Sequence, residues 1–194
     1  MNTFISINDN FLNEVDFEKY SKFSKETNMW GERIPNVNWS GRVIFTENIE
    51  GFSQRNSLFL NNVKNIIKTK FEIEEEIYPD YLGVVKWEVG DMQHPHADGE
   101  NENGEHPLHW RKFGCVLYLN DDYEGGEIYF PNQNIELKPA PNTLVFFPGS
   151  LEFLHGVKPI TNRSRYTLTS FWTYDKKYSI RYDNNPEQHN NSDS

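Results

Sequence analysis

The sequence has very little cysteine and no excess of basic side chains. Cys115 is the one cysteine among 194 residues, so no disulfide can form within the chain and a cysteine-rich zinc site is excluded. The formal net charge is -10, and an acidic chain without a dense cluster of Lys and Arg is repelled by phosphate backbones. We therefore expect no nucleic-acid partner, and any metal must be bound by His, Asp or Glu.

Long apolar runs are missing as well. No segment approaches the roughly 20 consecutive apolar residues of a membrane-spanning helix. The N-terminus MNTFISINDN has neither the basic start nor the apolar stretch of a signal peptide. We therefore expect a cytoplasmic protein with no membrane partner.

What the chain does contain is typical of one folded, β-rich domain. Aromatic residues make up 15% and hydrophobic residues 36% of the sequence. The length is about that of a single domain. We predict one domain over residues 1–182, with helical support in 1–80 and the β-rich core in 81–175, and a flexible tail rich in Asn and Ser over 183–194.

The first part of the chain carries helical spacing. A short strand is predicted over residues 3–7, and apolar side chains recur at helical intervals from 10 to 25. A second helix is predicted to begin with Ser53 as its cap. The apolar residues on one face of this helix are Phe59, Val63, Ile66, Ile67 and Phe71.

From Tyr81 onward, short β-type runs alternate with turns rich in Gly, Pro and Asn. The predicted strands are 82–89, 113–120, 127–130, 135–138, 143–147 and 165–173. Many short strands with no helical pattern between them indicate a sandwich or barrel. The sequence therefore predicts a mainly β fold with flanking α-helices.

Two histidines and an aspartate form a candidate metal site. Residues i and i+2 of a strand point to the same face, so His96 and Asp98 can present an imidazole and a carboxylate to one ion. His155 would arrive from a later strand. Two His and one carboxylate form the facial set that leaves coordination positions open on iron(II) for a bidentate cosubstrate and dioxygen.

Arg165 opens the last predicted strand, which is rich in aromatic and β-branched residues. Strand alternation places Arg165, Thr167, Thr169 and Phe171 on one face. A guanidinium that points into the protein needs a buried anion as partner. A dicarboxylate cosubstrate would supply one, because the planar fork binds a terminal carboxylate in a bidentate pair.

The order of motifs resembles the prolyl 4-hydroxylase-like branch of the 2-oxoglutarate and iron(II)-dependent oxygenases. The motifs, in order, are Gly90, His96-Ala-Asp98, Cys115-Val-Leu-Tyr118-Leu-Asn120, Glu124-Gly-Gly-Glu-Ile-Tyr-Phe-Pro131, Leu144-Val-Phe-Phe-Pro148, His155-Gly-Val-Lys-Pro159 and Arg165. This resemblance implies a double-stranded β-helix, or jelly roll, with N-terminal helices packed on it.

The same resemblance implies the ligands and their sites. Iron(II) would be held by His96, Asp98 and His155, and 2-oxoglutarate by Arg165. Tyr118 resembles the family tyrosine that hydrogen-bonds the far carboxylate of 2-oxoglutarate. Thr169 is a further candidate for that pocket. Dioxygen is the second cosubstrate, and ascorbate is a candidate reductant.

Other residues are candidates for contact with the substrate. The polar segment 99–112 directly follows the proximal ligands and could form a lid over the open iron positions. His109 and Trp110 lie within it. His106 and His109 could also form a zinc pair, although a substrate-facing or solvent role fits them better. The remaining candidates are Trp87, which could equally be a core aromatic, and His94 at the rim.

The expected reaction is hydroxylation of a C–H bond, with release of succinate and CO2. The motifs favour a prolyl residue in a peptide or protein, and a free amino acid or other small molecule is the alternative. A cupin-type metalloprotein is less favoured, because Asp98 stands where a cupin has His and Arg165 would have no role. A non-catalytic jelly-roll binding module would leave the whole constellation unexplained.

Overall fold

The computed structural model describes residues 4–31 and 41–180 of the chain. Two α-helices lie in the first part: α1 spans Glu14–Glu26 and α2 spans Ser53–Lys70. The strands are β1 (Ser6–Asn8), β2 (Arg42–Phe45), β3 (Tyr78–Trp87), β4 (Gln93–His96), β5 (Phe113–Tyr118), β6 (Glu124–Gly125), β7 (Ile128–Phe130), β8 (Ile135–Leu137), β9 (Leu144–Pro148), β10 (His155–Val157), β11 (Ile160–Asn162) and β12 (Arg165–Thr173). The tail predicted over 183–194 lies outside the described residues.

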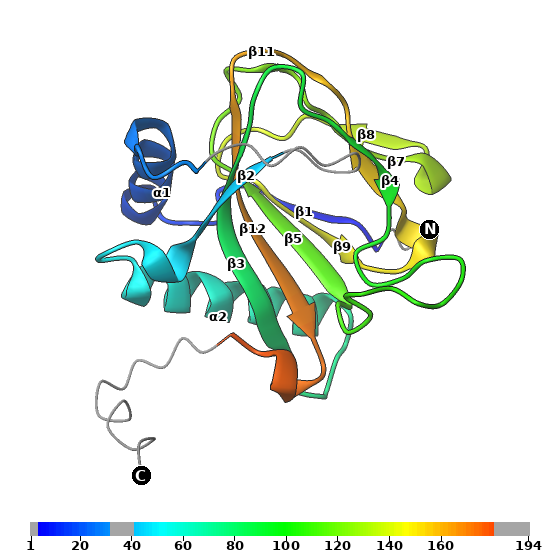
Figure 1. Cartoon of the computed structure of the whole chain (residues 1–194). Coiled ribbons are helices and arrows are strands. Elements are labelled where there is room, and N and C mark those ends of the chain that lie inside the picture. Colours follow the sequence, from blue (N-terminus) through cyan, green and yellow to red (C-terminus); the bar gives the residue numbers. More distant parts are fainter. Residues whose placement is uncertain (1–3, 32–40, 181–194) are drawn as a thin grey trace.

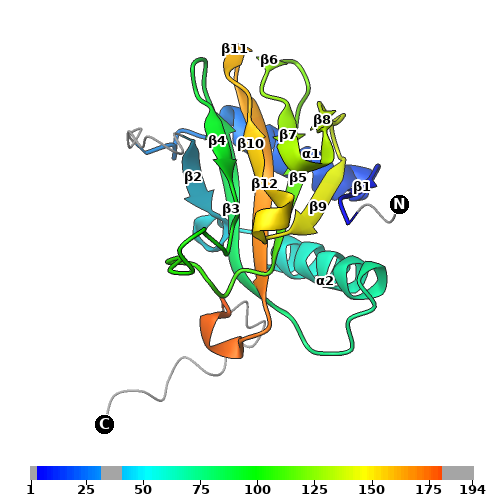
Figure 2. The same cartoon turned by 90° about the vertical axis from the view of Figure 1, so that its right-hand side faces the viewer.

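The strands form antiparallel sheets that face each other. The larger sheet has six strands in the order β1-β9-β5-β12-β3-β2, and the smaller has four in the order β4-β10-β7-β8. A short pair, β11-β6, joins them at one end. Figure 2 views the molecule from the side of the smaller sheet. The predicted jelly roll with flanking helices is confirmed.

Both edges of the large sheet come from the first part of the chain. β1 pairs with β9 at one edge, and β2 pairs with β3 at the other. The segment predicted as helical support therefore also supplies two strands of the core sheet. β2, β6 and β11 were not predicted, because such short runs carry too little alternation to be recognised. The strand expected at His96 and Asp98 is β4, but it ends at His96, so Asp98 lies just beyond it.

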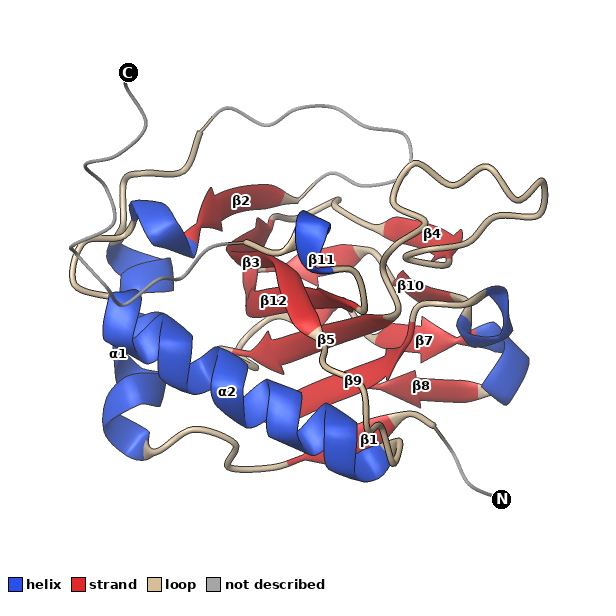
Figure 3. Cartoon of the chain, turned by 90° about the horizontal axis from the view of Figure 1, so that it is seen from below, coloured by secondary structure: helices blue, strands red, loops and turns tan. Residues whose placement is uncertain are grey.

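The helices cover the outer face of the large sheet, as Figures 1 and 3 show. Phe59, Val63 and Ile67 of α2 are fully buried in one cluster with Leu168 and Trp172 of β12. The intervening residues of β12 point the other way, into the space between the sheets. The predicted alternation of β12 is therefore confirmed. No helix in the described ranges is long and apolar enough to cross a membrane.

The helix starts differ in how they are capped. Asn13 caps α1, since its side chain accepts a hydrogen bond from Asp16 N at 3.0 Å. Ser53 was predicted to cap α2, but this was wrong. Ser53 is the first helical residue, and the cap position is taken by Phe52, which makes no side-chain capping bond. Burial of Phe52 against Tyr20 and Phe23 holds this end instead.

Candidate metal centre and its cavity

A cavity of about 510 Å³ lies between the two sheets. Its walls are mostly apolar, and its polar groups are few and clustered. These groups include His96, Asp98 and His155 at one place and Arg165 at another. A concave apolar space with a small number of converging polar groups is the usual form of a ligand site.

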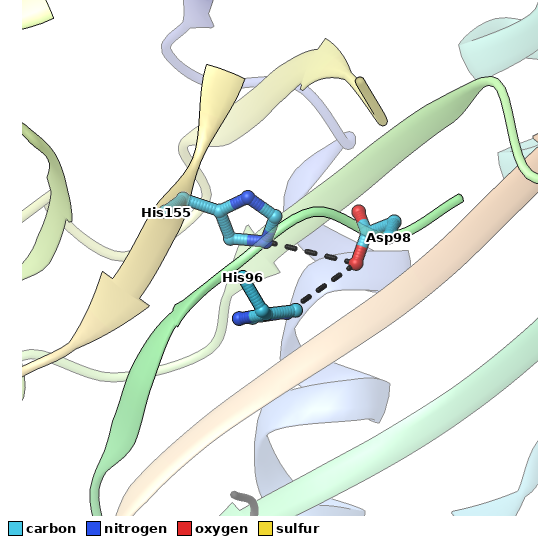
Figure 4. Close-up of side chains that lie close together, drawn as sticks. All are labelled: His96, Asp98 and His155. Carbon is cyan, nitrogen blue, oxygen red and sulfur yellow. Dashed lines mark ion pairs between the residues drawn. The ribbon is translucent and has the colours of Figure 1, made fainter. Parts of the chain in front are cut away.

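The three candidate ligands meet because of strand pairing. His155 opens β10, and its Cα lies directly opposite that of His96 at the end of β4. Asp98 follows two residues after His96. Asp98 Oδ1 is 3.5 Å from His96 Nε2 and 3.6 Å from His155 Nε2, as drawn in Figure 4. All three ligand atoms lie within 4.8 Å of one another, which is the spacing of donors around a single ion.

Backbone carbonyls orient both imidazoles. His96 Nδ1 donates to His94 O at 3.1 Å, and His155 Nδ1 donates to Phe153 O at 3.2 Å. A carbonyl oxygen only accepts, so the proton of each neutral ring sits on Nδ1 and the lone pair on Nε2. These bonds to carbonyls at Nδ1 are of the kind that direct metal-binding histidines at their ion. Gln93 Nε2 also donates to His96 Nε2 at 3.1 Å, so it contacts the lone pair that a metal ion would take.

Asp98 is as tightly enclosed as His155 and more so than His96. It is 6% exposed, and its Oδ2 is buried without a hydrogen-bond partner. A Cβ at Gly114 on β5 would overlap this oxygen, so only glycine leaves room for the carboxylate there. A buried carboxylate oxygen without a donor is costly unless a cation accompanies it. The donor set and this orphaned oxygen therefore fit a metal ion.

The electrostatics favour ligand protonation states at Asp98 and His155. Burial opposes ionisation of Asp98, but His155, His96 and Arg111 together hold the pKa of its carboxyl below the usual range. Burial lowers the pKa of His155 to about 4, so this ring is neutral near pH 7. For His96, burial acts in the same direction, yet the hydrogen bond and charge of Asp98 raise its pKa above the usual value. A cation at this point would reverse that effect.

The other polar end of the cavity is Arg165, which is 2% exposed. Its Nη2 donates to the Tyr118 hydroxyl at 3.0 Å, and its guanidinium carbon lies 5.5 Å from the centroid of the Trp87 ring. Within residues 4–31 and 41–180, no carboxylate forms an ion pair with Arg165. Because a buried cation is unstable without an anion, the site fits a carboxylate ligand.

The remaining predicted residues divide into two groups. Trp87 and Thr169 line the cavity, and Tyr118 borders it through its bond to Arg165. His94, His109 and Trp110 do not line it. His94 is exposed and takes part through its backbone carbonyl. The rings of His109 and Trp110 pack against Tyr178, beside the end of β12.

Within the 99–112 loop, different residues reach the cavity. They are His106, Leu108 and Arg111. Arg111 was not singled out in the sequence, because an Arg in a polar loop is usually solvated. Its place directly after Trp110 and two residues before Phe113 was the available signal, because an Arg near aromatic residues just before a buried strand is a candidate for cation–π packing.

Comparison with known proteins agrees with this geometry. A family model described as the 2OG-Fe(II) oxygenase superfamily matches residues 82–174. Human prolyl 3-hydroxylase 2 is 25% identical over 174 residues, which cover 74% of this chain and 25% of that protein. Prolyl 3-hydroxylase 1 of Gallus gallus is 35% identical over 77 residues, or 37% of this chain and 11% of that protein. The chain thus spans a quarter or less of the length of these relatives.

Solved structures share the fold. The viral collagen prolyl hydroxylase of Paramecium Bursaria Chlorella virus-1, in its 2OG complex, has a TM-score of 0.69 and 16% identity, covering 88% of this chain and 96% of that one. A Pseudomonas putida prolyl-4-hydroxylase has a TM-score of 0.65 and 17% identity, covering 88% and 92%. A Trichoplax adhaerens prolyl hydroxylase in complex with a hypoxia inducible factor peptide fragment has a TM-score of 0.65 and 17% identity, covering 90% and 85%.

The fold, the His-Asp-His cluster and the family match together define an oxygenase. Residues 82–174, which contain the His-Asp-His cluster and Arg165, match the 2-oxoglutarate and iron(II)-dependent oxygenase superfamily. Within that superfamily it is prolyl hydroxylase-like, as the sequence relatives and the structural neighbours both are.

Proposed function

We propose that the protein hydroxylates a C–H bond of a prolyl residue in a peptide or protein, with dioxygen as the oxidant. One oxygen atom enters the hydroxyl group and the other enters succinate, as 2-oxoglutarate is converted to succinate and CO2. One observation carries the proposal. The cluster of His96, Asp98 and His155 shares a single cavity with Arg165, a buried cation that has no carboxylate partner within the described residues. A cupin would need the metal cluster but not Arg165. A non-catalytic binding module would need neither of them.

The residues have separate roles in this proposal. His96, Asp98 and His155 hold iron(II), and Arg165 binds the far carboxylate of 2-oxoglutarate with help from the Tyr118 hydroxyl. Burial raises the pKa of Tyr118, although Arg165 opposes this, so the hydroxyl keeps its proton and can donate it in a hydrogen bond. Iron(II), 2-oxoglutarate and dioxygen would together supply the oxidising chemistry that no side chain can perform.

The protein itself contributes position and the exclusion of water. The cavity that holds the metal cluster and Arg165 has apolar side chains such as Val116, Ile128 and Phe147 in its wall. Phe147 also packs its ring 4.3 Å from that of His155. An apolar wall strengthens each charge interaction within the cavity and keeps the bound cosubstrate apart from solvent.

The prolyl part of the proposal rests on the relatives. Both the sequence relatives and the structural neighbours named above are prolyl hydroxylases, and one was solved with a peptide fragment. The mouth of the cavity offers aromatic side chains, Phe45, Tyr81 and Phe171, on which a pyrrolidine ring could pack. A free amino acid or another small molecule remains the second candidate substrate.

The test measures succinate release in the presence of iron(II), 2-oxoglutarate and oxygen. Proline-containing peptides and free amino acids are compared as substrates. Ascorbate is included in one series, since it is proposed as a reductant. Turnover stimulated by peptides, with hydroxyproline in the product, is the expected result. Stimulation by free amino acids alone would shift the proposal to the second candidate. Absence of iron-dependent succinate release would contradict both.

A further inference from the structure

The loop between β4 and β5 is fastened at its C-terminal end by one carboxylate. Asp80 on β3 has a side chain only 3% exposed. Its Oδ2 accepts from Trp110 Nε1 at 2.7 Å and from Arg111 Nε at 2.9 Å. The Trp110 ring in turn stacks on Tyr178, with centroids 3.9 Å apart and planes 8° from parallel. Two adjacent loop residues are therefore held by the same oxygen.

The backbone of this end is fixed as well. Lys112 N donates to Trp172 O at 2.7 Å, and Gly149 N donates to Lys112 O at 2.8 Å. At the other end of the loop, Gly99 N donates to Gly149 O at 3.0 Å. A Cβ at Gly99 would overlap the carbonyl oxygen of Arg111, so the two ends of the loop touch. Because the backbone around Arg111 is held, the direction of its guanidinium group depends only on its side-chain torsion angles.

The hydrogen bond to Asp80 fixes the side-chain torsion angles of Arg111 and involves only part of its guanidinium group. The Arg111 guanidinium carbon lies 3.8 Å from the centroid of the Phe171 ring, and the side chain lines the cavity. Only Nε is bonded to Asp80; across the described ranges, no acceptor takes a hydrogen bond from Nη1 or Nη2. The guanidinium group is planar and carries five N–H donors. A hydrogen bond that fixes the Nε–H direction therefore also fixes the directions of the four N–H groups on Nη1 and Nη2.

We propose that Asp80 is a positioning residue for the primary substrate. It holds Arg111 so that the free Nη donors bind an oxygen acceptor of that substrate, either a peptide carbonyl or a carboxylate. The inference rests on the proposed function, because Arg165 is there assigned to 2-oxoglutarate and Arg111 is left for the second substrate. Arg165 and Phe171 stand six residues apart on β12, so the two guanidinium groups serve opposite ends of one cavity.

The experiment is a double-mutant cycle read out by binding. Asp80→Ala, Asp80→Asn, Arg111→Gln and the Asp80→Ala/Arg111→Gln double variant are loaded anaerobically with iron(II) and 2-oxoglutarate. Three probes are titrated by calorimetry: acetyl-Gly-Pro-Gly-amide, N-acetylprolinamide and N-acetylproline. The first two offer only carbonyl acceptors, and the third offers a carboxylate. Asp175→Asn is the matched control, since this exposed carboxylate also lies beside Tyr178 but not in the cavity.

Asp80→Ala is expected to weaken binding of the preferred probe about tenfold, the effect of one good hydrogen bond to a charged group. Asp80→Asn keeps an acceptor oxygen and should recover most of this loss. The double variant should bind as weakly as Arg111→Gln alone, because Asp80 acts through Arg111. The affinity for 2-oxoglutarate should be unchanged by Asp80→Ala, while the indole N–H resonance of Trp110 moves in its NMR spectrum.

Several outcomes would overturn the inference. They are losses that multiply in the double variant, an equal loss of 2-oxoglutarate affinity, or failure of every probe to bind the unaltered protein. If Asp80→Ala does not fold, the cycle is run with Asp80→Asn, and its effect must likewise vanish in the Arg111→Gln background. Failure of the unaltered protein to bind 2-oxoglutarate would instead contradict the proposed function, and the probes are then titrated without it.

Discussion

Arg165 and Arg111 are two largely buried guanidinium groups in one cavity, and they differ in their partners. Arg165 is paired with no carboxylate within the described residues, and its one polar contact from Nη2 is the neutral Tyr118 hydroxyl. Arg111 has a buried carboxylate of its own, Asp80, at 2.9 Å. A buried cation that lacks an internal anion is suited to an external one, whereas a paired cation is held in place.

We expect this difference to separate cosubstrate recognition by Arg165 from substrate recognition by Arg111. The same cosubstrate would bind in every turnover. Its carboxylate can therefore neutralise the charge of Arg165, and the site needs no internal anion for this purpose. A substrate group that is neutral, such as a peptide carbonyl, would not compensate a bare buried charge. An arginine whose charge is already balanced by Asp80 can still donate hydrogen bonds to it.

The largest effect is expected from a change in the candidate metal centre, which lies in the same cavity as both arginines. His155→Ala deletes a proposed iron ligand and should reduce iron-dependent succinate release to background, with loss of bound iron measured by metal analysis. Glu152→Ala, an exposed change in the preceding turn, is the control. Succinate release by the His155→Ala variant at the unaltered rate would rule out the metal assignment.

The next effect tests the unpaired arginine. Arg165→Met should weaken 2-oxoglutarate binding by about 4 kcal/mol, roughly 1000-fold, because the ligand carboxylate is left without its cation. Without ligand, the free energy of unfolding should stay the same or rise by about 1 kcal/mol, since an unpaired buried charge is removed. Calorimetry and urea unfolding measure the two quantities.

Arg163→Met is the matched control for that change, because Arg163 is exposed and forms only a long surface contact with Asp122. It should alter neither quantity. A marked loss of stability in ligand-free Arg165→Met would show that Arg165 has an internal role, and the comparison between the two arginines would fail.

The paired arginine should behave in the opposite way. Arg111→Met leaves Asp80 buried without its cation, so the free energy of unfolding should fall by about 3 kcal/mol. Affinity for 2-oxoglutarate should change far less than in Arg165→Met. Lys158→Met, which removes an exposed ion pair with Glu136, serves as the reference for an unimportant pair. If the two variants had the same free energy of unfolding, the role of Asp80 as a buried partner of Arg111 would be refuted.

The smallest effect concerns the second donor to Asp80. Trp110→Phe keeps an aromatic ring for stacking on Tyr178 but removes the indole N–H, and it should lower the free energy of unfolding by about 1.5 kcal/mol. The measurement is again urea unfolding, with Trp110→Tyr as a second aromatic replacement. An unchanged midpoint in both variants would mean that Arg111 alone stabilises Asp80.

Much of the architecture could be predicted from the sequence, because it depends on local periodicity. The alternation in β12 that points Arg165 and Thr169 into the protein is a property of any strand, and the structure confirms it. The spacing of His96 and Asp98, with His155 at a later strand, was enough to predict a metal site, and the structure brings the three together. Their role as iron ligands stays a prediction.

Other features depended on contacts between distant segments. Asp80 and Arg111 are 31 residues apart and share no pattern that links them. The need for glycine at Gly114 follows only from where the Asp98 carboxylate arrives. The choice of His106 over His109 as a cavity residue depends on how the loop turns between its fixed ends.

The sequence by itself therefore determined the family, the fold class and the residues of the candidate metal and cosubstrate sites. These follow from the spacing of residues within a strand and from a characteristic order of motifs along the chain. Only the tertiary structure decided that Arg111 pairs with Asp80 and that Arg165 has no carboxylate partner within the described residues. Charge balance in a buried cavity depends on which groups packing brings within a few ångströms, and no spacing along the chain encodes that.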